Sequence, residues 1–164
     1  MKANDNLNKS PFFWRIIVTF SGIGYFPVAP GTAGSIAALI PAILIMNYAV
    51  YSSLWLLALI AVFTVLGVIG SSIMEKHWCK DPQNIVVDEA VGMWISLLFL
   101  PFNWFLVITA FILFRFFDIF KPWGISKLQD MKGGYGIMAD DIVAGIAANI
   151  TTQVLFILVK LFMR

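Results

Sequence analysis

Charged side chains are scarce in this chain of 164 residues, of which only 12% are Asp, Glu, Lys or Arg while 60% are hydrophobic. A water-soluble domain carries about 25% charged residues, because its surface needs them. The chain has too little polar surface for a water-soluble globule, so the sequence predicts an all-α integral membrane protein. Its length suits one membrane-embedded domain over residues 1–164, with residues 1–10 as a flexible cytoplasmic start.

Cysteine, histidine and basic clusters are also rare. Cys79 is the only cysteine, which excludes an internal disulfide, and together with the single His77 it offers too few ligands for a zinc site. The net charge is only +2, and no basic stripe is interleaved with aromatic residues. This composition disfavours nucleic acid as a partner.

Long uncharged runs predict about five transmembrane helices. No charged residue occurs between Arg15 and Glu75, and Tyr51–Ser53 is the weak polar break within that run. The predicted spans cover residues 35–50, 54–74, 86–100, 105–120 and 142–159. The segment 12–30 contains Gly22, Gly24, Pro27 and Pro30, which would break a membrane helix. We therefore expect it to be an N-terminal interfacial or re-entrant segment that does not span.

Charge defines the two sides of the predicted topology. Both hairpin turns, Tyr51–Ser53 and Pro101–Trp104, are uncharged, whereas every other connection is rich in charge. The cations on the charged side are Lys2, Lys9, Arg15, Lys76, Lys80, Lys121, Lys127 and Lys132. The positive-inside rule makes this side cytoplasmic, although Lys160 and Arg164 then fall on the opposite side.

Five carboxylates gather where predicted spans meet the cytoplasmic face. Asp88 and Glu89 begin one span, Asp118 ends another, and Asp140 and Asp141 precede a third. Acids favour helix N-termini in any protein, so each one alone has a purely structural alternative. At one depth, however, five carboxylates would repel one another unless a cation or protons lay among them. Oxygen ligands without a cluster of His or Cys favour Mg²⁺, so we expect these five acids to supply metal ligands and a catalytic base.

Groups suited to phosphate lie beside the acids. Arg115, Asp118 and Lys121 are spaced three residues apart on one helix face, which Pro122 should end. Arg115 and Lys121 would bind phosphate oxygens, and the alternative is a local ladder of ion pairs. Thr32 and Ser35 follow a glycine-rich loop as expected N-caps, and a helix N-terminus can bind an anion. The alternative is a glycine-rich cap without a ligand.

Four stretches in order resemble the phosphatidylglycerophosphatase A family over about residues 12–150. They are Pro30-Gly31-Thr32-Ala33-Gly34-Ser35, Ile85 to Glu89 with Gly92-Met93-Trp94, Phe114 to Trp123, and Gly133 to Gly145. The resemblance implies a Mg²⁺-dependent enzyme of the bacterial inner (cytoplasmic) membrane with its active site facing the cytoplasm. Its substrate would be phosphatidylglycerophosphate, which lies among the other lipids of the membrane. The enzyme would remove the terminal phosphate of this lipid to give phosphatidylglycerol. Gly124 and Lys132 depart from the family pattern and concern loop geometry rather than the acids.

Other functions remain open at this point. An ion-coupled transporter could use carboxylates at the membrane edge, although no charge interrupts the middle of a predicted span. An enzyme that transfers a phosphoalcohol to lipid would need an Asp-Gly motif followed by Ala-Arg, which is absent. In a structural protein the acids would only mark topology. The sequence also leaves open the oligomeric state, the number of metal ions, which acid is the base, and whether an aspartate attacks phosphorus directly.

Overall fold

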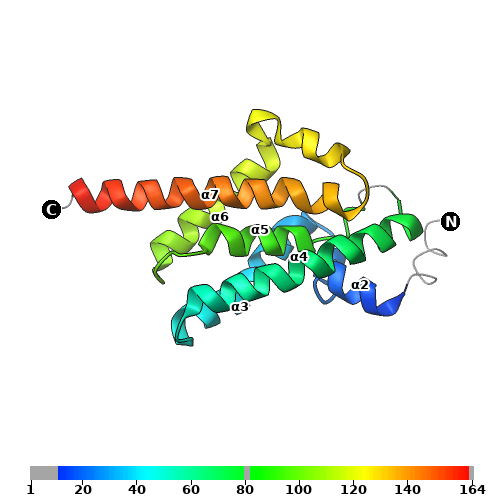
Figure 1. Cartoon of the computed structure of the whole chain (residues 1–164), viewed down its shortest axis with the longest axis horizontal. Coiled ribbons are helices and arrows are strands. Elements are labelled where there is room, and N and C mark those ends of the chain that lie inside the picture. Colours follow the sequence, from blue (N-terminus) through cyan, green and yellow to red (C-terminus); the bar gives the residue numbers. More distant parts are fainter. Residues whose placement is uncertain (1–10, 80–81, 163–164) are drawn as a thin grey trace.

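The computed structural model describes residues 11–79 and 82–162, and in this part of the chain every regular element is helical. The elements in order are α2 (Phe12–Val18), η1 (Ile23–Tyr25), α3 (Pro30–Tyr48), α4 (Ser52–His77), α5 (Val87–Leu97), α6 (Trp104–Phe120), η2 (Pro122–Asp130) and α7 (Gly134–Phe162). Figure 1 shows α3, α4 and α7 running roughly along the longest axis, with η2 beside α7. The expected flexible start (residues 1–10) and Lys80 lie outside the described residues.

Three of these helices, α3, α4 and α7, are long and apolar enough to cross a membrane. The all-helical membrane class is therefore confirmed. Helix α5 has only 11 residues, or about 16 Å at 1.5 Å per residue, against a hydrocarbon core of about 30 Å. Helix α6, with 17 residues, reaches about 26 Å. The structure thus has shorter helices where two full spans were predicted, and the count of five spans stays a prediction.

Helix α5 forms the centre of the bundle. It packs against α3, α4, α6 and α7, and most of its side chains are buried. The indole Nε1 of Trp94 donates a hydrogen bond to the Ala38 carbonyl of α3 at 2.8 Å. Gly92 and Gly145 allow α5 and α7 to cross closely, because a Cβ on Gly145 would lie 2.4 Å from the Gly92 carbonyl oxygen. The helix that begins with Asp88 and Glu89 is therefore held on several sides.

Backbone carbonyl groups at the C-terminal end of α5 accept hydrogen bonds from a side chain of α7. A helix that ends inside a membrane protein leaves carbonyl groups that water cannot reach. Asn149 donates hydrogen bonds from Nδ2 to the Ser96 carbonyl at 3.1 Å and to the Leu98 carbonyl at 2.8 Å. This amide allows α5 to stop after 11 residues.

The segment before α3 makes only short helical turns. Helix α2 has seven residues, and Thr19 ends it by donating from Oγ1 to the Arg15 carbonyl at 2.7 Å. The chain then reverses through Gly22, whose φ of +92° is readily adopted by glycine. Phe12 and Phe13 on α2 are exposed. The interfacial or re-entrant placement of this segment stays a prediction.

Candidate active site

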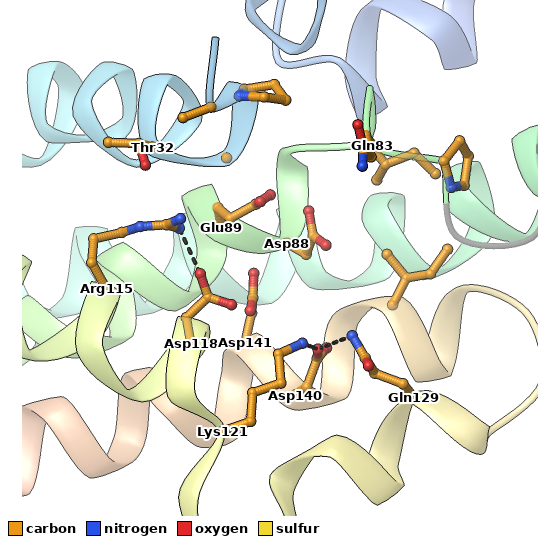
Figure 2. A pocket seen from close by; sticks show the side chains of 16 residues that line it. Thr32, Gln83, Asp88, Glu89, Arg115, Asp118, Lys121, Gln129, Asp140 and Asp141 are labelled. Atoms are coloured by element: carbon orange, nitrogen blue, oxygen red, sulfur yellow. Dashed lines mark hydrogen bonds and ion pairs between the residues drawn. The ribbon is translucent and has the colours of Figure 1, made fainter.

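The helix ends that the sequence marked with charge surround one cavity of about 460 Å³. It lies where the N-terminal parts of α3, α5 and α7 meet the C-terminal end of α6, with the loop before α5 and with η2. Eight of the nine predicted site residues line it, as Figure 2 shows: Thr32, Asp88, Glu89, Arg115, Asp118, Lys121, Asp140 and Asp141. The ninth, Ser35, is fully buried and lies behind this wall.

Three of the carboxylates form a group able to hold a metal ion. Asp88 and Glu89 come from the first turn of α5 and Asp141 from α7, and one oxygen of each lies within 4.8 Å of the others. Asp88 Oδ1 and Glu89 Oε2 are buried without a hydrogen-bond partner among the described residues. Buried carboxylates this close repel when charged, and a cation removes that repulsion. The donors are all oxygens, which fits Mg²⁺.

Asp118 is held by an arginine one turn earlier on α6. Arg115 Nη1 lies 2.6 Å from Asp118 Oδ2 and also donates to Ser35 Oγ at 3.3 Å. Ser35 in turn donates to the Gly31 carbonyl at 2.9 Å. The Arg115–Asp118 part of the expected ladder therefore exists as an ion pair, and it stands at the cavity wall.

The prediction that Thr32 and Ser35 cap a helix was wrong. Helix α3 begins at Pro30, and its N-cap is Ala29, whose side chain makes no capping bond. Proline is well suited to the first helical position, because its ring sets φ and no N–H is needed there. The first turn of α3, with Thr32, nevertheless lines the cavity. Gly31 lets the Glu89 carboxylate come close to α3, since a Cβ there would lie 2.1 Å from Glu89 Oε1.

Asp140 is bound by two donors that leave one of its oxygens unpartnered. Lys121 Nζ and Gln129 Nε2 both donate to Asp140 Oδ2, the latter at 2.9 Å. Asp140 Oδ1 is buried with no partner in the described part of the chain. Burial alone would lower the pKa of Lys121, but the hydrogen bond and charge of Asp140, with smaller effects of Asp141 and Asp118, raise it above its usual value. The ammonium group therefore stays charged beside the acids.

Gln129 and the early start of α7 were not predicted. Helix α7 begins at Gly134, eight residues before the expected start of the span at Ile142, because Ser72 Oγ of α4 accepts from the Gly134 amide at 2.8 Å. Asp140 and Asp141 thus lie in the second turn of α7 rather than ahead of it. Gln129 reaches Asp140 only because η2 folds back against α7, which no local pattern signals.

The fold and the cavity together define a helical membrane protein with a candidate active site at one end of its long apolar helices. Three apolar helices are long enough to span a bilayer, and at one end of them acids able to hold a cation face an arginine, a lysine and a helix N-terminus. The sequence model of the family described as Phosphatidylglycerophosphatase A matches residues 16–156, so the chain belongs to that family.

The relatives match most of this chain, and two of them carry the name of this family. Proteins named Phosphatidylglycerophosphatase A from Escherichia coli K12 and Haemophilus influenzae are 38% and 37% identical to it over 136 residues. These matches cover 81% and 79% of this chain, and 77% and 80% of the relatives. A Bacteroides thetaiotaomicron protein named "Putative phosphatidylinositol-3-phosphatase" is 43% identical over 153 residues, covering 89% of this chain and 96% of the relative. No solved structure matches, and the transporter alternative finds no support in these matches.

Proposed function

We propose that the protein hydrolyses the terminal phosphomonoester of phosphatidylglycerophosphate to phosphatidylglycerol and inorganic phosphate. The reaction depends on Mg²⁺ and takes place at the cytoplasmic face of the bacterial inner membrane. The observation that carries this proposal is the group of Asp88, Glu89 and Asp141 beside Arg115, at the end of helices long enough to span a bilayer. The names of the E. coli and H. influenzae relatives support the choice of substrate.

Asp88, Glu89 and Asp141 would hold the cation, because their oxygens lie close together and two of them have buried, unpartnered atoms among the described residues. When bound, Mg²⁺ polarises a phosphate oxygen and lowers the pKa of a water molecule. A carboxylate of the site takes a proton from the attacking water, whose oxygen bonds to phosphorus as the bond from phosphorus to the glycerol oxygen breaks. The glycerol oxygen leaves with the proton that the carboxylate took up and becomes the new hydroxyl of phosphatidylglycerol.

The positive groups bind the negative head group, and positive charge in the site offsets the charge of the reacting phosphate. Lys121 is kept charged and fixed by Asp140, while Arg115 is fixed by Asp118 and Ser35. The first turn of α3 adds backbone N–H groups that have no partner within the helix, together with the Thr32 hydroxyl. These groups hold the head group with its two phosphates, while the apolar helix surfaces leave the lipid tails in the bilayer.

A second candidate function has its own observation, the identity of 43% to a protein named for phosphatidylinositol 3-phosphate. Both lipids carry a phosphomonoester on a polyol head group, so the same site chemistry would serve either. Purified enzyme in detergent micelles should be given each lipid separately with Mg²⁺, and released phosphate measured. We expect faster release from phosphatidylglycerophosphate. Faster release from phosphatidylinositol 3-phosphate would support the second candidate, and release from neither by folded enzyme would contradict both.

A further inference from the structure

The two cations of the cavity wall lie at different depths. Arg115 and Lys121 are six residues apart on the end of α6, which is about 9 Å along a helix axis. Lys121 follows the last residue of α6, and Arg115 lies toward the apolar middle of that helix. Across the cavity, Thr32 stands in the first turn of α3, one of the three helices long enough to span the bilayer. One cation of the cavity wall is therefore nearer the apolar middle of α6, and the other lies just past its C-terminal end.

Arg115 keeps capacity for a further acceptor. Its Nη1 is occupied by Asp118 and Ser35, whereas its Nε is buried and has no hydrogen-bond partner among the described residues. In Figure 2 the guanidinium reaches between Thr32 and Asp118, on the α3 side of the cavity. Lys121 differs, because its ammonium group is engaged by Asp140 on the α7 side. The two cations thus serve different parts of the cavity.

The head group of the proposed substrate carries two phosphates, one nearer the lipid tails and one farther from them, as the cavity has one cation toward the middle of α6 and one at its end. Its phosphodiester is next to the glycerol that carries the tails, and its phosphomonoester is at the far end. The tails stay in the bilayer, so the diester must lie nearer the middle of the spanning helices than the monoester. Arg115 has the position along α6 expected for the diester, and Asp88, Glu89, Asp141 and Lys121 line the rest of the cavity, which is left for the monoester.

We propose that Arg115, assisted by Thr32, binds the lipid phosphodiester and so makes the enzyme selective for lipids that carry both a phosphodiester and a terminal phosphomonoester. This rests on the proposed lipid phosphatase function. Phosphatidic acid has a phosphomonoester and tails but no diester, so it would leave Arg115 without its ligand. Phosphatidylinositol 3-phosphate has both groups, so this selectivity is independent of which polyol the enzyme prefers.

The test compares kcat/KM for dioctanoyl phosphatidylglycerophosphate and dioctanoyl phosphatidic acid in wild type, Arg115→Gln and Thr32→Val. Losing a charged hydrogen bond to the diester should lower kcat/KM for the diester lipid by about tenfold to a hundredfold in Arg115→Gln. The value for phosphatidic acid should fall much less, so the preference of the wild type collapses. Thr32→Val should change the same ratio in the same direction by a smaller factor. The ratio is taken within one preparation, so it does not depend on the folded fraction.

The matched control is Lys76→Gln, which removes an exposed cation from the last turn of α4 outside the cavity wall and should leave the ratio unchanged. Phosphatidylglycerol, which keeps the diester and lacks the monoester, serves as a competitive inhibitor. Its inhibition constant should rise about tenfold in Arg115→Gln, since the diester is the group it shares with the substrate. Equal losses on both substrates, or an unchanged inhibition constant, would overturn the proposal. Wild-type enzyme that prefers phosphatidylinositol 3-phosphate over phosphatidylglycerophosphate would overturn the proposed substrate alone, because the comparison with phosphatidic acid can be repeated on that lipid.

Discussion

Replacing Gly31 by alanine should reduce activity strongly while leaving the protein folded. A Cβ at this position would lie 2.1 Å from Glu89 Oε1, whereas ordinary van der Waals contact begins at 3.4 Å. The Glu89 carboxylate is the flexible end of its side chain, so it can move aside at little cost in stability. Alanine also suits a helix better than glycine, by about 0.5–1 kcal/mol. The carboxylate would, however, be displaced by about 1 Å from the acid group, and such a displacement costs on the order of a hundredfold in rate.

The assay is phosphate release from phosphatidylglycerophosphate by purified Gly31→Ala, with the melting temperature in detergent measured alongside. Glu89→Asp and the double variant complete a cycle, because the shorter acid removes the contact with the new methyl group. Adding Gly31→Ala to Glu89→Asp should therefore cost much less than it costs the wild type. Wild-type activity in Gly31→Ala would refute this reasoning, as would equal costs in both backgrounds.

Three other outcomes follow from the structure. Asn149→Leu should destabilise the protein by roughly 1–3 kcal/mol, because the carbonyls at the end of α5 lose their donor, and an unchanged melting temperature would contradict that role. Asp141→Asn should lower the apparent Mg²⁺ affinity at least about a hundredfold, since losing residues that only orient metal ligands already costs about 10–100-fold. If Asp141→Asn responds to Mg²⁺ with the same affinity as the wild type, Asp141 is not a metal ligand. With Cys79 changed to serine, cysteines at Tyr51 and Lys132 should be labelled from opposite sides of the membrane in cells, and labelling from one side would contradict the predicted topology.

The clustering of the acids could be predicted because charge is so rare in this chain. Acids at the ends of apolar runs had to lie near one membrane face, and all five line one cavity. Local signals also worked: Pro122 follows the end of α6, and Tyr51–Ser53 lies at the turn between α3 and α4. Each of these signals lies within a few residues of the feature that it predicts.

The parts that could not be predicted depend on contacts between distant residues. The uncharged run through α5 has the composition of a span, but the helix ends after Leu97, where Asn149 supplies the donors that water cannot. Helix α7 starts early because Ser72 accepts from the Gly134 amide. Gln129 reaches Asp140 in the cavity only because η2 packs against α7. Three of the acids form a group that can hold a cation, and the other two each pair with a basic side chain. This division also depends on how the helices are placed in three dimensions.

We propose above all that Asp88, Glu89 and Asp141 hold a divalent cation that the phosphatase reaction requires. Its most direct test is a Mg²⁺ titration of phosphate release from phosphatidylglycerophosphate, starting from EDTA-treated enzyme, with wild type and Asp88→Asn side by side. We expect no release without the metal, full recovery of the wild type on adding Mg²⁺, and a variant that recovers only weakly at far higher Mg²⁺ concentrations. Release that persists in EDTA, or an Asp88→Asn variant that matches the wild type throughout the titration, would contradict it.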